Sequence, residues 1–141
     1  MKWLFYSSSK EQEIEAIIYF WNKLIIKYLK KIAQMKRMGQ VIGVKPEDFE
    51  KYKQYHAAVW PGVLGMIKKC HIENYSIFHK DGMLFAYFEY TGEDYEADMA
   101  RMAADPKTQE WWSIMEPMQQ PVETRKEGEW WASMEEVFHL D

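Results

Sequence analysis

Tyr52 and His56 stand four residues apart in the stretch that ends at Trp60 and Pro61. Side chains at this spacing lie one turn apart on the same face of a helix. The imidazole of His56 can donate or accept a proton near neutral pH, and the phenol of Tyr52 can hydrogen-bond a polar ligand. A hydrophobic core would be served more simply by leucine or isoleucine, so the pair indicates a binding site with acid–base chemistry.

His56 also lies close to the end of its helix. The helix is expected to begin at about Pro46 and to end at about Ala58, because Trp60, which precedes Pro61, favours extended backbone. A histidine at a helix C-terminus can serve only to complement the negative end of the helix dipole, which is an alternative to a catalytic role. In both interpretations the nearby carbonyl groups are expected to favour the protonated imidazole.

Three further aromatic residues could complete such a site. Tyr75 falls early in an expected strand, and Trp111 and Trp112 fall on a helix after a proline. Indole faces suit the apolar C–H surface of a sugar, while tyrosine hydroxyls can bind its polar groups. A deoxy sugar with a methyl group would fit this wall especially well. Tryptophan pairs are also frequent in hydrophobic cores, so a purely structural interpretation stands beside this one.

Other chemistries have little support in the sequence. The four histidines, His56, His71, His79 and His139, show no metal-ligand spacing, so no metal is expected. No glycine-rich nucleotide-binding motif occurs, and no nucleophile motif surrounds Cys70. We therefore expect neither a cofactor nor a covalent intermediate.

Composition places the chain among ordinary globular proteins. Its 141 residues suit one core, with 48% hydrophobic and 28% charged residues. A net charge of -4 argues against a nucleic-acid partner. The single cysteine forms no internal disulfide, and no secretory pattern is visible, so a cytoplasmic protein is expected. The early apolar run at 16–21 is far shorter than the ~20 residues of a membrane span.

Residues 11–37 predict one amphipathic helix with acids near its start and lysines toward its end. One interpretation is an appended helix that packs on the domain or on a partner. Another is a helix that lies on a membrane surface. A third interpretation places the natural start of translation at Met35.

The rest of the chain predicts an α+β domain. From residue 36 the order is strand, helix, strand, strand, helix, strand, with a hairpin turn at Asp81-Gly82. This is the ferredoxin-like βαββαβ order, which forms a four-stranded antiparallel sheet with helices on one face. The strand at 83–90 is apolar on both faces, so a second subunit or a pocket should cover the open face. The strands are expected at 37–44, 73–80, 83–90 and within 130–140.

Residues 35–141 resemble the L-rhamnose mutarotases. The resemblance rests on four matched stretches in the right order: Tyr-x-x-x-His-x-x-Val-Trp-Pro at 52–61, Asn-Tyr-Ser-Ile at 74–77, the pair Trp111-Trp112, and the terminal Glu-Glu-Val-Phe-His-Leu. Residues 1–34 have no place in the pattern, so we interpret them as an N-terminal helical extension of a mutarotase-like domain. In one departure, Gly62 stands where relatives often carry glutamate.

The resemblance implies a cofactor-free cytoplasmic isomerase of rhamnose metabolism. It implies a homodimer of the dimeric α/β-barrel type that interconverts the α- and β-anomers of L-rhamnose by acid/base-assisted opening and closing of the sugar ring. His56 would be the proton donor. The residues that contact the sugar would be Tyr52, Tyr75, Trp111 and Trp112.

Two alternatives remain open at the level of sequence. The same dimeric architecture carries cofactor-free and haem-using monooxygenases, because a fold does not determine a function. A non-catalytic sugar-binding module is the other alternative. It would bind the sugar without accelerating anomer exchange.

Overall fold

The computed structural model describes residues 9–140, and residues 31–34 in backbone only. The chain divides into two compact units between Gln34 and Met35. The first unit contains one long helix, α1 (Ser9–Gln34). The second contains a sheet and four α-helices.

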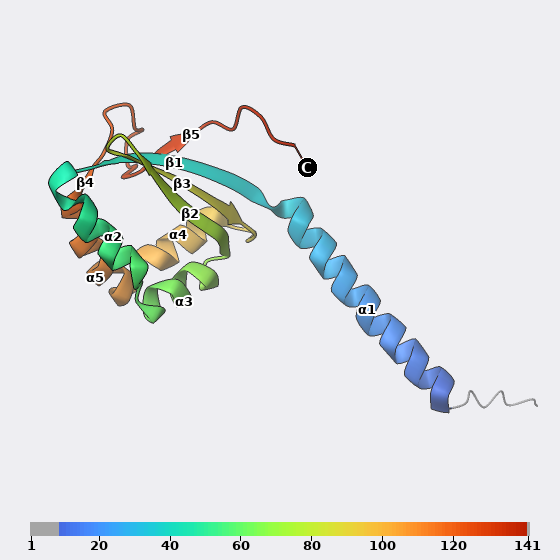
Figure 1. The fold of residues 1–141 in the computed structure, drawn as a ribbon. Coiled ribbons are helices and arrows are strands. Elements are labelled where there is room, and N and C mark those ends of the chain that lie inside the picture. Colours follow the sequence, from blue (N-terminus) through green and yellow to red (C-terminus); the bar gives the residue numbers. More distant parts are fainter. Residues whose placement is uncertain (1–8, 141) are drawn as a thin grey trace, which may run out of the picture. The chain divides into compact units, whose positions relative to one another are not determined.

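The sheet has the ferredoxin-like strand order (Figure 1). β1 (Lys36–Val44) and β3 (Met83–Tyr90) are central, and β2 (Ile72–Lys80) lies beyond β3 at one edge. All pairings are antiparallel. The predicted fold class and the order of its elements are therefore confirmed.

The last strand differs from the sequence-based expectation. β5 covers only Ala132–Met134, instead of most of 130–140, and it pairs with β1 at Gly39–Val41. A second short strand, β4 (Gln119–Gln120), pairs with the far end of β1. Two short segments, β4 and β5, thus take the place of a single fourth strand beside β1. The loop that joins them starts and ends at the same edge of the sheet.

Four helices lie on one face of the sheet (Figure 1). Proline sets the start of several helical segments, as expected from its fixed φ. Asp94 and Asp105 cap the last two α-helices by accepting hydrogen bonds from the amides of Ala97 and Thr108. The segments are η1 (Pro46–Asp48), α2 (Phe49–Ala57), α3 (Pro61–Lys69), α4 (Tyr95–Ala103), α5 (Pro106–Met115) and η2 (Glu116–Met118).

The core lies between the helices and the sheet. Alternate residues of β3 point toward the helices, and Leu84, Ala86, Phe88 and Tyr90 are all buried. The hairpin between β2 and β3 turns at Asp81 and Gly82, with φ angles of 51° and 76°, as predicted from the Asp-Gly pair. The largest buried cluster joins both layers and contains Ile42, Val44, Tyr52, Val63, Leu84, Trp111, Met115 and Met118.

A buried carboxylate fixes α4 to the end of β3. Asp98 accepts hydrogen bonds from the Tyr90 hydroxyl and the His71 Nδ1, both at 2.7 Å, and from Arg101 at 2.8 Å. Burial alone would raise the pKa of Asp98, but these hydrogen bonds outweigh it and hold the pKa below its ordinary value. Gly92 permits this packing because a Cβ there would collide with Tyr90 and Asp98.

The helix α1 ends at Gln34, three residues before the expected end at Arg37. Lys36 and Arg37 belong instead to β1, where they pair with Tyr90 and Glu89 of β3. Backbone pairing across the sheet has overridden the continuing helical pattern of the sequence. Within residues 9–140, no helix is both long and apolar enough to span a bilayer.

Candidate active site

The last turn of α2 holds the imidazole of His56 through its own backbone. The Nδ1 atom lies 2.9 Å from the carbonyl oxygen of Tyr52, four residues earlier. A carbonyl oxygen can only accept, so Nδ1 carries the hydrogen and donates it. Nε2 is therefore the atom of the neutral ring that can take up a proton.

Aromatic rings enclose His56 on two sides. The Tyr52 ring stacks on it with centroids 4.1 Å apart, and Trp111 meets it edge-on at 5.4 Å. Burial lowers the pKa of His56 below 6.5, more than the hydrogen bond to Tyr52 raises it. The expectation that the helix end favours the protonated imidazole is thus wrong, because loss of hydration outweighs the nearby carbonyls. At neutral pH the ring is a base with a free Nε2.

All five predicted site residues line one small cavity of about 160 Å³. They come from three elements, α2, β2 and α5, and the fold of the domain brings them together. Cavities for drug-sized ligands are typically ~300–1,000 Å³, so this one suits a single sugar ring. The lining residues are Tyr52, His56, Tyr75, Ile77, Trp111, Trp112, Met115, Glu116, Gln119, Trp130 and Trp131.

The two tyrosines supply neutral hydroxyl groups. Burial raises the pKa of Tyr52 well above 10, and the neighbouring Tyr75 raises it further. Tyr75 as a whole residue is 41% exposed, and partial loss of hydration, with a smaller effect from Tyr95, raises its pKa above 10. Both phenols therefore stay protonated near neutral pH, and they can donate and accept hydrogen bonds without acting as charged bases.

The tryptophan pair has two roles in the fold. Trp111 is 5% exposed and belongs to the main core cluster, where it also meets Tyr55 and Trp60 edge-on. Trp112 is half-buried and packs against both core clusters. Both rings also line the cavity, so the core interpretation holds for Trp111 and the binding-wall interpretation stays a prediction.

A glutamine that the sequence analysis missed lines the cavity beside Tyr52. The side chain of Gln119, in β4, is buried, and its Oε1 accepts a hydrogen bond from the Trp130 Nε1 at 2.8 Å. Its amide nitrogen is then the group near the Tyr52 hydroxyl, where it lowers the pKa of Tyr52 in part. Trp130 and Trp131 form a second tryptophan pair in the sequence. This second pair could have indicated that Trp130 and Trp131 belong to the site, but the sequence offers no such signal for Gln119.

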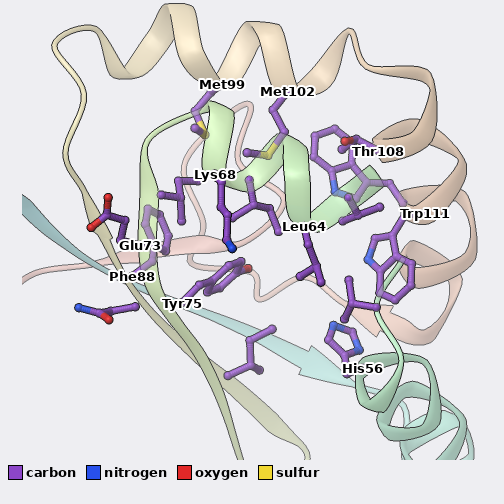
Figure 2. Close-up of a pocket in the computed structure, with 17 residues that line it drawn as sticks. His56, Leu64, Lys68, Glu73, Tyr75, Phe88, Met99, Met102, Thr108 and Trp111 are labelled. Atoms are coloured by element: carbon purple, nitrogen blue, oxygen red, sulfur yellow. The ribbon is translucent and has the colours of Figure 1, made fainter. Parts of the chain in front are cut away.

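A larger cavity of about 850 Å³ adjoins the small one (Figure 2). The two share His56, Tyr75, Trp111 and other residues as a common wall. Figure 2 shows His56 and Trp111 at one end and Glu73 at the other, with the Tyr75 side chain between them. The larger space is lined chiefly by apolar side chains and lacks Tyr52. Polar side chains such as Lys68 and Glu73 line it as well, but only the small cavity holds all five predicted residues, and we therefore take the small cavity as the candidate site.

A metal centre has no basis in the described part of the chain. Among residues 9–140, no three His, Cys, Asp or Glu side chains gather closely enough to hold a metal ion. The chemistry of the site consists of one imidazole, neutral hydroxyl and amide groups, and the carboxylate of Glu116.

A family profile described as L-rhamnose mutarotase matches residues 37–140. The chain belongs to the L-rhamnose mutarotase family. The match confirms the resemblance seen in the sequence, and residues 1–36 lie outside it. The family segment therefore contains the whole candidate site and excludes α1.

Three curated members of the L-rhamnose mutarotase family align with this chain along their full length. The proteins from Oceanobacillus iheyensis and Lactiplantibacillus plantarum are 32% and 35% identical, and each alignment covers 76% of this chain and 100% of the relative. The Bacillus subtilis protein is 34% identical over 110 residues. All three are named L-rhamnose mutarotase.

A solved structure of an L-rhamnose mutarotase from Formosa agariphila has a similar fold. Its TM-score is 0.58, and the alignment covers 75% of this chain and 99% of that one. The identity is 23%, so this likeness bears on the fold alone. It agrees with the ferredoxin-like arrangement of the second unit.

Proposed function

We propose that this protein interconverts the α- and β-anomers of L-rhamnose. The observation that carries the proposal is the convergence of Tyr52, His56, Tyr75, Trp111 and Trp112 on one cavity, in a chain of the L-rhamnose mutarotase family. His56 is the catalytic residue of the proposal, and the other four bind the sugar.

The proposed reaction moves protons and leaves no net change. The His56 Nε2 takes the proton of the anomeric hydroxyl, the C1–O1 bond becomes a carbonyl, and the bond from C1 to the ring oxygen breaks. The resulting imidazolium returns its proton to the ring oxygen through a water or a sugar hydroxyl. Rotation about C1–C2 presents the other face of the aldehyde, and the reverse steps close the ring. No electrons are transferred, so the proposal includes no cofactor.

The remaining residues hold the sugar during ring opening. The neutral Tyr52 hydroxyl can donate its hydrogen to a sugar oxygen. Tyr75 offers a second neutral hydroxyl. Trp111 and Trp112 face the apolar side of the ring, where the methyl group of a 6-deoxy sugar would lie.

Dissolved crystals of pure α-L-rhamnose test the function. The approach to anomeric equilibrium, followed by polarimetry, should be faster in proportion to protein concentration. A sugar-binding module would bind L-rhamnose without changing the rate, and that outcome would contradict the proposal.

The rate should depend on pH through His56. The base form is needed, and burial places the His56 pKa below 6.5. We therefore expect kcat/KM to rise with pH through that pKa and to be level at neutral pH. Rates measured from pH 4 to pH 8, each corrected for spontaneous exchange, give the profile. Activity that fell as the pH rose through 6.5 would mean that the protonated imidazole acts first.

We also propose a homodimer formed through the sheet face that carries no helices. Phe78 and Phe85 are cross-strand neighbours there and are 64% and 36% exposed. Met134, 41% exposed, extends this apolar surface onto β5. An apolar sheet face of this kind is normally covered by a partner, and a symmetric copy would meet it with the same residues.

Sedimentation equilibrium tests the dimer. At micromolar concentration the protein should sediment with twice the mass of one chain, and Phe85→Glu should shift it toward the monomer. A wild-type protein that sediments as a monomer would contradict the proposal.

Residues 35–141 are proposed as the catalytic domain and residues 1–34 as an extension that catalysis does not require. The residues that line the two cavities all belong to the second unit, and the first of them in the sequence is Tyr52. The boundary between the two units follows Gln34. A chain that begins at Met35 should keep its kcat/KM in the polarimetric assay. A large loss of rate would mean that the extension builds part of the site.

We propose the cytoplasm as the compartment and rhamnose metabolism as the context. Cys70 is a buried free thiol, and burial raises its pKa, so it is unreactive and suits a reducing environment.

A further inference from the structure

The helix α1 carries a continuous apolar stripe along one side. Ile14, Ile17, Ile18, Trp21, Leu24, Ile25, Tyr28 and Leu29 recur at helical spacing along one side. These side chains are between 42% and 64% exposed. An apolar stripe of this length is rare on the surface of a monomer and marks an interaction site.

The opposite side of α1 carries three lysines, and the exposed Tyr19, Phe20 and Ile26 lie between these lysines and the stripe. Lys23, Lys27 and Lys30 follow one another at spacings of four and three residues, so they share one face of the helix. No acid occurs between Glu15 and Glu47, although the whole chain has a net charge of -4. The basic charge is thus concentrated on the last part of this helix and the residues that follow it.

We propose that α1 lies on the surface of a bilayer that contains anionic lipids. A helix with lysines on one face and Trp, Tyr and Ile on the other lies in the plane of the interface, with its apolar face in the acyl boundary. The lysine stems reach outward to the phosphate groups, and the rings of Trp21 and Tyr28 occupy the level that such rings prefer. The helix does not cross the bilayer, since it is too polar to span one.

The pattern fits a lipid surface better than a second copy of α1. A coiled coil needs aliphatic residues at both core positions of each heptad. With Ile18 and Ile25 at one core position, the other falls on Trp21 and Tyr28. Two bulky rings with polar edges pack poorly in such a seam, while a lipid interface accepts them.

Co-flotation of the full chain with vesicles tests the proposal. The protein should float with vesicles of phosphatidylcholine and phosphatidylglycerol and should bind pure phosphatidylcholine much more weakly. The triple variant Lys23→Gln/Lys27→Gln/Lys30→Gln should partition roughly a hundredfold more weakly into the anionic vesicles, since each lysine near an anionic surface is worth about fivefold.

A matched control changes three exposed lysines of the second unit. Lys51→Gln/Lys69→Gln/Lys80→Gln removes the same charge, and it should bind the anionic vesicles like the parent chain. A second variant, Ile17→Ser/Trp21→Ser/Leu24→Ser, keeps every lysine and should also lose binding. Circular dichroism of each variant reports whether its fold is kept.

Three results would overturn the proposal. Equal binding to neutral and anionic vesicles would show that the lysines do not contribute. An equal loss of vesicle binding in the two lysine variants would show that α1 is not the binding element. Absence of vesicle binding, together with an oligomer that the serine variant dissociates, would show that α1 pairs with a second copy. None of these results depends on whether L-rhamnose is the substrate.

Discussion

Replacement of His56 by alanine is expected to lower the rate of anomer exchange by about 10²–10⁴, or roughly 3 to 5 kcal/mol of barrier. The loss follows from the geometry of the last turn of α2. The bond from Nδ1 to the Tyr52 carbonyl leaves Nε2 as the proton acceptor, and no other histidine lines either cavity. Sugar binding should weaken far less, because Tyr52, Tyr75 and the tryptophans remain.

His139→Ala is the matched control. His139 is exposed and lies outside both cavities, so its replacement should leave kcat unchanged. Circular dichroism of both variants checks that the fold is kept. A His56→Ala protein that exchanges anomers as fast as the parent would show that another group carries the proton.

Replacement of Trp111 by alanine is expected to have the largest effect on stability. Its ring is 5% exposed, in contact with Tyr55, His56 and Trp60. Removal of a buried tryptophan ring costs about 3–5 kcal/mol of the free energy of unfolding. The same change opens the wall of the cavity, so KM for the sugar should rise. Urea denaturation gives the stability, and kinetics on the folded fraction give KM.

Trp112→Ala separates the two roles of the tryptophan pair. This ring lines both cavities and is only half-buried, so its loss should raise KM with a smaller loss of stability than in Trp111→Ala. If Trp111→Ala cost less than about 1 kcal/mol, within the range of ordinary single substitutions, its place in the core would be refuted.

Much of the fold follows from local patterns in the sequence. The Asp81-Gly82 turn and the alternation in β3 identify the central hairpin, and prolines mark the helix starts. The last strand was less predictable, because residues 130–140 are apolar enough for a long strand but only Ala132–Met134 find a partner on β1. Pairing of an edge segment depends on a neighbour that is distant in the sequence.

The candidate site was predictable in its residues but not in its electrostatics. Five of the lining residues were named from the sequence and from the resemblance to a family, and the fold places them together. The sign of the His56 pKa shift was missed, because a sequence shows the helix end but not the rings of Tyr52 and Trp111 that exclude water from the imidazole. The bond from Trp130 to Gln119 was missed for a similar reason, since it joins a short strand to a loop.

Saturation transfer between the anomeric protons of L-rhamnose tests the central claim most directly. At equilibrium the two anomers give separate NMR signals, and spontaneous exchange between them in water is slow. The proposal predicts that the parent protein increases the exchange rate in proportion to its concentration, and that His139→Ala does the same while His56→Ala does so about 10²–10⁴ times less. An exchange rate that is the same with and without the parent protein would contradict the proposed activity.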